Sequence, residues 1–182
     1  MFFRYTPRYV LVFFACVFSA STAFALDPIT STPIKSQSAP ATAIKLDVFK
    51  SPTCTCCEKW VANLETNGFQ STVHHPADLN QEKLNRHIAP QYQSCHTAVS
   101  TEGYVFEGHV PANLIKRFLA EKPKNALGLA VPGMPAGSPG MEMGDRFTPY
   151  DVLLLNADGS SRVYARINSV HDQEEGDHHD HH

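Results

Sequence analysis

Three cysteines stand within four residues of the stretch SPTCTCCEKW, residues 51–60, as Cys54, Cys56 and Cys57. A fourth, Cys95, follows far along the chain in QSCHTAV. Thiolates attack disulfides and also bind soft metal ions, so these cysteines predict either redox chemistry or a metal site. A disulfide oxidoreductase uses two thiols separated by two residues, and Cys54 and Cys57 have that separation. Spacing alone therefore leaves both kinds of chemistry open.

The adjacent pair Cys56 and Cys57 favours copper over zinc. Two neighbouring residues would strain to direct both sulfurs at one tetrahedral zinc ion, whereas they can bridge two ions easily. Cu(I) is selected by soft sulfur ligands and accepts bridging thiolates. The candidates for secondary metal ligands are His96, His109, Met134, Met141 and Met143. Taken singly, each could equally be a hydrogen-bonded histidine or a methionine that packs.

The N-terminus predicts export. Arg4 and Arg8 precede an apolar run at residues 10–18, and small residues follow as far as Ala25, which is the pattern of a signal peptide at residues 1–25. The apolar run is shorter than the roughly 20 residues that span a bilayer, so no stable membrane insertion is expected after cleavage. Four cysteines remain in a compartment that permits disulfides, and two structural disulfides would also account for them.

Charge argues against nucleic acid as a partner. The chain of 182 residues has 15 basic and 18 acidic residues, a net charge of −3. Removal of the signal peptide takes away two arginines and makes the mature chain more acidic. Proteins that bind nucleic acid concentrate basic residues instead.

One folded domain is predicted at residues 44–168, after a flexible leader at 26–43 that is rich in Pro, Ser, Thr and Ala. Alternation in IKLDVF predicts a first strand from Ile44, and FQSTVH predicts a second at 69–74. Between them, a helix that ends near Gly68 is predicted from three apolar residues on one face, Trp60, Val61 and Leu64.

The middle of the chain predicts two more helices and two short strands. Asp78 is placed to cap a helix that ends before Pro90, with Leu79, Leu84 and Ile88 on its buried side. Strands are expected around 97–100 and 104–107. Pro111 then suits the start of a helix with an apolar stripe, namely Leu114, Ile115, Phe118 and Leu119.

This order, β-α-β-α-β-β-α with cysteines between the first strand and first helix, predicts an α/β, thioredoxin-like fold. In such a fold the segment before the third strand passes over the active-site cysteines. Cys95 lies in that segment, so it is expected to meet Cys54, Cys56 and Cys57 in one pocket.

The last third of the chain predicts a long loop, a hairpin and a tail. The stretch ALGLAVPGMPAGSPGMEMGDRFTP is too rich in Gly and Pro for a helix or a central strand, and its methionines favour packing onto the protein. A C-terminal β-hairpin is expected around the turn at Asp158–Gly159. The tail at 169–182 is predicted to be disordered. Its histidines either bind divalent metal ions or stay solvated.

Four stretches together resemble the CopG family of periplasmic copper-resistance proteins: SPTCTCCEKW, SCHTA, GYVFEGHVPA and GLAVPGMPAGSPGME. The resemblance covers residues 44–167. It implies a thioredoxin-like fold and a multinuclear copper-thiolate cluster that interconverts Cu(I) and Cu(II) in copper detoxification. Carried over by position, the implied copper ligands are Cys54, Cys56, Cys57 and Cys95.

We therefore expect an exported, periplasmic copper-binding protein of copper resistance, with copper redox activity as the enzymatic hypothesis. Its expected partners are copper ions and another periplasmic copper or redox protein. Two alternatives stay open. One is a thiol-disulfide oxidoreductase that acts on partner proteins through Cys54 and Cys57. The other is a passive copper buffer or chaperone that shares the site without turnover.

Overall fold

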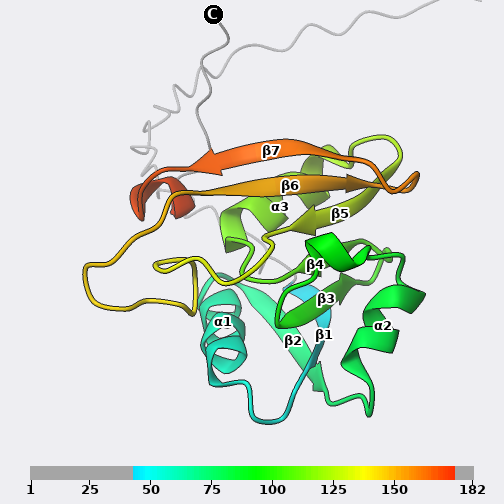
Figure 1. The fold of residues 1–182 in the computed structure, drawn as a ribbon, viewed down its shortest axis with the longest axis horizontal. Coiled ribbons are helices and arrows are strands. Elements are labelled where there is room, and N and C mark those ends of the chain that lie inside the picture. Colours follow the sequence, from blue (N-terminus) through cyan, green and yellow to red (C-terminus); the bar gives the residue numbers. More distant parts are fainter. Residues whose placement is uncertain (1–42, 175–182) are drawn as a thin grey trace, which may run out of the picture. The chain divides into compact units, whose positions relative to one another are not determined.

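The computed structural model describes residues 43–174, and the predicted signal peptide lies outside them. The described chain forms a seven-stranded sheet with three α-helices and two short 3₁₀ helices (Figure 1). In chain order the elements are β1 (Ile44–Lys50), α1 (Thr55–Thr66), β2 (Phe69–His74), α2 (Leu79–Asn85), η1 (Pro90–Tyr92), β3 (His96–Ser100), β4 (Val105–Glu107), α3 (Ala112–Glu121), β5 (Ala126–Ala130), β6 (Tyr150–Asn156), β7 (Ser161–Ile167) and η2 (His171–Gln173).

The strands follow the order β2-β1-β3-β4-β5-β6-β7 across the sheet. β1 pairs parallel with β2 and antiparallel with β3, and β3 pairs antiparallel with β4. β5 joins β4 in parallel, and the hairpin of β6 and β7 completes the sheet. The predicted order β-α-β-α-β-β-α is thus confirmed from β1 to α3, and so is the C-terminal hairpin. The comparison with the thioredoxin fold stays a prediction.

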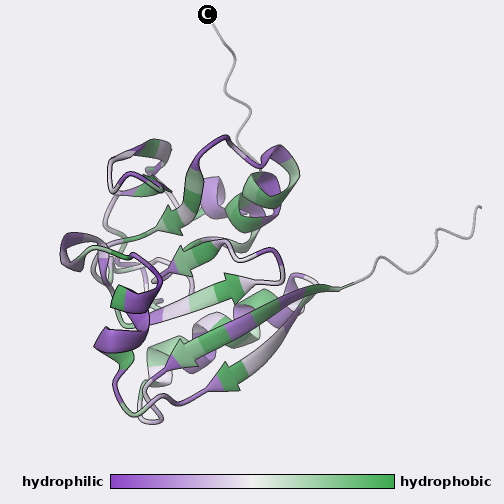
Figure 2. Cartoon of the chain, turned by 90° about the vertical axis from the view of Figure 1, so that its right-hand side faces the viewer, coloured by the Kyte–Doolittle hydropathy of each residue, from purple (hydrophilic) through white to green (hydrophobic). Residues whose placement is uncertain are grey.

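Two hydrophobic clusters cover the two faces of the sheet, with α1 and α2 on opposite sides of β1 and β3 (Figure 1). The larger cluster joins α1 and α3 to the sheet through residues such as Trp60, Leu114 and Phe106. The smaller cluster lies on the α2 side and includes Ile88 and Val99. Figure 2 shows the hydrophobic residues gathered along the strands. We call these two sides the α1 face and the α2 face.

Local sequence signals account for the first two helices. Trp60, Val61 and Leu64 are buried on α1, as their helical spacing predicted, and the helix ends just before Gly68. The Asp78 carboxylate caps α2 by accepting a hydrogen bond from the Gln81 backbone N–H. These elements therefore form where the sequence placed them.

The buried side of α2 differs from the prediction. Leu84 is 47% exposed, whereas Lys83, which hydropathy would place in solvent, is only 1% exposed. Lys83 is buried because its ammonium group meets the carboxylate of Glu107 on β4. A buried charge needs such a partner, and helical periodicity could not show one that comes from a distant strand.

The predicted loop that begins at residue 126 was also partly wrong, because its first five residues form β5 inside the sheet. The glycine that argued against a strand is what allows this pairing. A Cβ atom at Gly128 would lie 1.8 Å from the Val105 carbonyl oxygen, so only glycine lets β5 approach β4 here. The loop proper then runs from 131 to 149.

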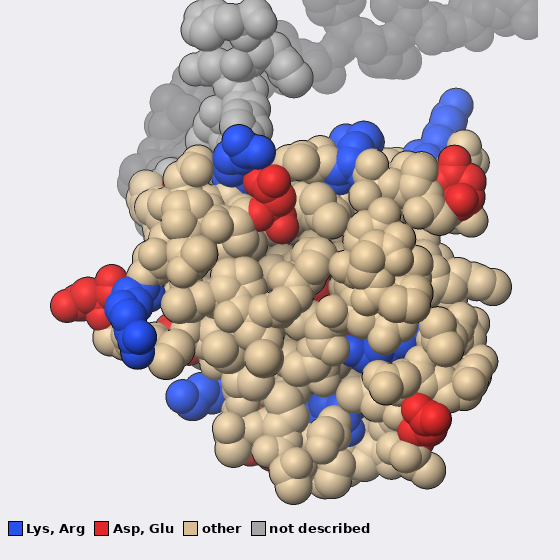
Figure 3. Space-filling view, in the orientation of Figure 1, with Lys and Arg blue, Asp and Glu red and all other residues tan. Residues whose placement is uncertain are grey.

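The fold extends into the segment that was predicted as a disordered tail. Residues 171–173 form η2, and Gln173 donates to the Gly137 carbonyl and lies within hydrogen-bond distance of the Tyr150 hydroxyl. The remaining tail histidines lie outside the described residues. None of the helices between residues 43 and 174 has the length and apolar character to cross a membrane. On the face drawn in Figure 3, basic and acidic side chains are scattered and form no single basic patch.

Candidate metal centre

The cysteine motif lies at the junction of β1 and α1. β1 ends at Lys50, and Cys54 is the N-cap residue of α1, with its carbonyl oxygen accepting from the Glu58 N–H. Cys56 and Cys57 follow in the first turn. The unpaired amide groups and the positive dipole at a helix N-terminus stabilise thiolates. The location predicted from sequence for these cysteines is therefore confirmed.

Two of the four cysteines are joined to each other in this structure. Cys54 and Cys57 form a disulfide, and Cys56 and Cys95 are free. Sequence reasoning had left disulfides and metal as alternatives and could not choose a pair. The observed pairing is the one with two intervening residues, which belongs to redox-active dithiols. Two of the sulfurs thus become ligands only after reduction.

Cys95 joins the other three cysteines across a wide separation in sequence. One sulfur atom from each of Cys54, Cys56, Cys57 and Cys95 lies within 4.8 Å of the others. The Cys57 sulfur lies 3.8 Å from the Cys95 carbonyl oxygen, and the Cys54 and Cys56 sulfurs are 3.5 Å apart. The structure therefore brings together the four thiol groups that the sequence predicted would meet.

Cys95 also belongs to a second group of possible ligands with two histidines. Its sulfur lies 3.2 Å from His96 Nδ1 and 3.1 Å from His109 Nε2. His96 is the first residue of β3, and His109 lies between β4 and α3, so the fold carries both rings to one sulfur. The two groups share Cys95 and no other residue.

The protonation state of His109 follows from its partners. Its Nδ1 lies 2.8 Å from the Pro139 carbonyl oxygen, which can only accept, so Nδ1 carries the proton. Burial lowers the pKa of His109, which favours the neutral ring. Nε2 then has its lone pair free on the side of Cys95. A backbone carbonyl that fixes the tautomer in this way is typical of metal-binding histidines.

His96 lies deeper in the protein. It has no exposed surface, and its ring is packed against Trp60 and His109. Burial lowers the pKa of His96 well below its usual range, and the neighbouring His109 adds to that effect. Its Nε2 has no hydrogen-bond partner among the described residues, whereas Nδ1 is the nitrogen that lies beside the Cys95 thiol. Both causes of the lowered pKa favour the neutral ring.

Burial also determines the protonation state of the Cys95 thiol. It raises the pKa of Cys95 to about 12, and the nearby Cys56 contributes in the same direction. In the state with a Cys54–Cys57 disulfide, Cys95 is thus a protonated thiol at neutral pH. Because a metal ion binds the thiolate, metal binding at this residue displaces a proton.

The loop between β5 and β6 closes the centre on one side. Ser138, Pro139 and Gly140 are all buried, and Gly140 lies against the start of α1. A Cβ at Gly140 would lie 2.7 Å from the Cys56 carbonyl oxygen and 2.8 Å from Trp60 N. We call residues 138–140 the strap. The predicted packing of this loop onto the protein is confirmed, and the strap also orients His109 through the Pro139 carbonyl.

The three methionines lie in the same loop. Met134 and Met143 are 54% and 45% exposed, and Met141 is half-buried. Met134 follows Gly133, whose carbonyl accepts from the hydroxyl of Ser94, the residue before Cys95. Met134 is therefore adjacent in sequence to a residue that contacts the segment before Cys95. A ligand role for the methionines stays a prediction.

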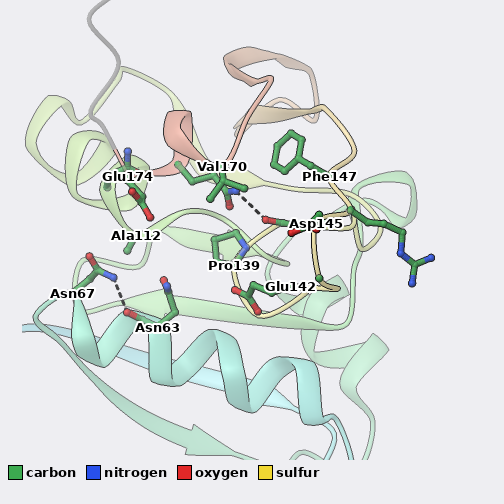
Figure 4. A pocket seen from close by; sticks show the side chains of 14 residues that line it. Asn63, Asn67, Ala112, Pro139, Glu142, Asp145, Phe147, Val170 and Glu174 are labelled. Atoms are coloured by element: carbon green, nitrogen blue, oxygen red, sulfur yellow. Dashed lines mark hydrogen bonds between the residues drawn. The ribbon is translucent and has the colours of Figure 1, made fainter.

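A cavity of about 700 Å³ opens on the other side of the strap (Figure 4). Pro139 lines it, together with Asn63 of α1 and Glu142 and Phe147 of the loop. None of the described residues that line it is a cysteine or a histidine. The cavity is therefore separate from the thiol groups.

The sequence did not predict the short distances between the ring nitrogens of His96 and His109 and the Cys95 sulfur. His96 was an evident candidate, because it is adjacent to Cys95 in the chain. His109 had only its place in a motif, and its link to Pro139 depends on how the strap folds. Lys83 and Glu107, which hold the residue before Cys95, gave no signal at all in the sequence.

Part of the chain matches a known protein family. Residues 92–141 match a family model described as a protein of unknown function, DUF411. No curated protein sequence matches the chain.

Two solved structures match over most of the described chain. The first, described as copper resistance protein CopG, form 2, is 41% identical, with a TM-score of 0.65, and the match covers 69% of this chain and 98% of that one. The second, form 1 of CopG, is also 41% identical, with a TM-score of 0.64, over 70% and 99% of the two chains. The chain therefore belongs to the CopG family of copper resistance proteins.

Proposed function

We propose that this protein binds copper through Cys54, Cys56, Cys57 and Cys95, and that it interconverts Cu(I) and Cu(II) as a part of copper resistance. The observation that carries the proposal is that Cys95 belongs to both ligand groups. One group offers four sulfurs, which favour Cu(I), and the other offers one sulfur and two imidazoles, which also suit Cu(II). Copper ions are the substrate in this account.

The number of sulfurs supports more than one copper ion at the centre. Four thiolates confined within 4.8 Å of one another, two of them on adjacent residues, favour bridged ions over one tetrahedral zinc ion. Around them, His96 and His109 are the secondary ligands that geometry favours. Met134, Met141 and Met143 are weaker candidates, because their sulfurs have no described link to the cysteines. The signal peptide predicted at residues 1–25 supports a periplasmic location.

The Cys54–Cys57 disulfide supplies the redox partner that the reaction needs. When both residues are thiolates, they can give up one electron each and form this disulfide. Two Cu(II) ions would accept those electrons and become Cu(I), so electrons balance within the site. In that oxidised state Cys56 and Cys95 keep free sulfurs, and His96 and His109 lie beside Cys95, so these four would be the donors left for Cu(I) until the disulfide is reduced. The reverse reaction oxidises two Cu(I) ions and restores both thiolates. A thiol or copper redox protein is the class of partner that would reset the pair.

The test is a count of thiols against Cu(II) consumed. Reduced mature protein is mixed anaerobically with Cu(II), and the loss of the Cu(II) electron paramagnetic resonance signal is followed beside the loss of free thiols. We expect two Cu(II) ions to be reduced for each disulfide formed. Cys57→Ser, which cannot form the pair, should lose this reaction. Persistent Cu(II) with all thiols retained in the unsubstituted protein would reject the redox function and leave a passive copper buffer.

A second candidate function, thiol-disulfide exchange with a partner protein, is favoured by the same disulfide. Its two cysteines have the spacing and the helix N-terminal location of redox-active dithiols, and Cys54 is partly exposed. Metal-free, reduced protein would then reduce a model disulfide substrate at a useful rate. Such a rate, together with no reduction of Cu(II), would replace the copper reaction by this function.

A further inference from the structure

A buried ion pair lies beside the centre on the α2 face. Lys83 Nζ of α2 lies 2.6 Å from Glu107 Oε1 of β4, and the two residues are 1% and 0% exposed. Burial raises the pKa of Glu107, and the Lys83 ammonium opposes that rise. Charges are costly to bury, and a pair of apolar side chains of similar volume often gives equal or greater stability. Packing of the core therefore does not explain why a lysine and a glutamate occupy these two positions.

Both members of the pair hold the backbone of Ser94. The Ser94 N–H donates to Glu107 Oε1 at 2.6 Å, and the Ser94 carbonyl accepts from Lys83 Nζ. The Ser94 hydroxyl donates to the Gly133 carbonyl at 2.5 Å. Both backbone polar groups of Ser94, the residue before Cys95, are therefore hydrogen-bonded to the ion pair.

Regular structure does not hold this part of the chain. η1 ends at Tyr92, with the Gln93 N–H donating to the Pro90 carbonyl, and β3 begins at His96, so residues 94 and 95 lie between them without helix or strand bonding. Gly108 allows its own segment to lie close to Ser94, since a Cβ atom at Gly108 would lie 2.7 Å from Ser94 Cβ. The ion pair thus takes the place of a strand ladder directly before the shared thiol.

We infer that Lys83 and Glu107 are positioning residues that fix Ser94 and thereby hold the Cys95 sulfur against the other ligands. The functional part of this inference rests on the proposed copper site, whereas the structural part does not. Neither side chain has a described hydrogen bond to the Cys95 sulfur, so the contacts that position this sulfur run through the Ser94 backbone. Without them, the Cys95 segment would sample several positions and bind copper less tightly.

Two matched double variants test the inference. Lys83→Met/Glu107→Leu removes both contacts with Ser94, while Lys83→Met/Glu107→Gln keeps a side-chain oxygen that can accept the Ser94 N–H. Both variants lose the same two charges, so they differ in the side-chain amide that Glu107→Gln keeps at this position. A further control, Lys122→Met/Glu102→Leu, removes the exposed pair between Lys122 and Glu102 with the same change in charge.

The first readout is amide hydrogen exchange in metal-free protein. In the Leu double variant, we expect exchange at Ser94 to rise at least about tenfold, since hydrogen bonds to charged groups are among the stronger ones. Exchange at Val48, in the centre of β1, should not change. In the Gln double variant and the exposed-pair control, Ser94 should exchange slowly. Unchanged exchange at Ser94 in the Leu variant, or an equal rise at Val48, would overturn the inference.

The second readout is the rate at which a Cu(I) chelator removes copper from loaded protein. The Leu double variant should release copper about tenfold faster than the Gln double variant, because only the former leaves Cys95 unheld. Equal release rates would refute the link to Cys95. If the parent protein binds no copper, the proposed function fails, yet the exchange data still decide whether the ion pair holds Ser94.

Discussion

The buried polar groups near Cys95 differ between the α1 face and the α2 face in the partners that they have. On the α1 face, His96 Nδ1 and His109 Nε2 lie 3.2 and 3.1 Å from the Cys95 sulfur, and His96 Nε2 has no partner among the described residues. On the α2 face, Lys83 and Glu107 pair with each other and with Ser94. One face therefore offers ligand atoms, and the other fixes the chain that carries the thiol. A metal centre requires both contributions, and here the fold separates them by a sheet.

The largest expected effect comes from breaking the α2 face. Lys83→Met alone leaves the Glu107 charge buried without its partner, so we expect the free energy of unfolding to fall by about 3–5 kcal/mol. The Lys83→Met/Glu107→Leu variant should lose much less. Urea unfolding of the metal-free proteins measures both values. Equal losses in the single and double variants would show that the two charges do not compensate each other.

A substitution in the strap, on the α1 face, should lower the free energy of unfolding less than Lys83→Met does. Gly140→Ala would introduce a Cβ into the backbone of α1 at a φ of +87°, so we expect a loss of about 1–3 kcal/mol and faster release of copper. Gly144→Ala is its control, because Gly144 also has a positive φ but nothing within 4 Å of its Cβ position. The control should cost about 1 kcal/mol and leave copper release unchanged. Similar copper release from both variants would mean that the strap does not close the centre.

The smallest expected change in stability has the opposite sign. His96→Leu replaces a buried ring whose Nε2 has no partner in the described chain, so the metal-free protein should gain about 1 kcal/mol. The same variant should bind Cu(II) more weakly, as measured by electron paramagnetic resonance titration. His74→Leu, at a partly exposed histidine paired with Asp47, should leave Cu(II) binding unchanged. Normal Cu(II) affinity in His96→Leu would remove His96 from the ligand set.

Much of the first half of the fold followed from local patterns. The alternation of β1, the apolar stripe of α1 and the Asp78 cap of α2 are all encoded within a few neighbouring residues. β5 was missed because the need for Gly128 depends on the Val105 carbonyl of another strand. Lys83 was misplaced for the same reason, since its burial depends on Glu107.

The candidate site shows the same division. Four cysteines could be named from spacing and family resemblance, and their convergence followed from the element order. The tautomer of His109 could not be predicted, because the Pro139 carbonyl reaches it only after the strap has folded. Nor could the disulfide be assigned from sequence, since reactive thiols at a helix start admit several pairings.

The shared thiol is the centre of this account, and the copper content of Cys95→Ser tests it most directly. Fully reduced Cys95→Ser and unsubstituted protein are loaded with Cu(I) without oxygen, freed of unbound copper, and analysed for copper per chain. The account predicts a lower ratio in Cys95→Ser, because both ligand groups lose their common sulfur. An unchanged ratio would contradict it, since copper would then need only the three cysteines of the β1–α1 junction.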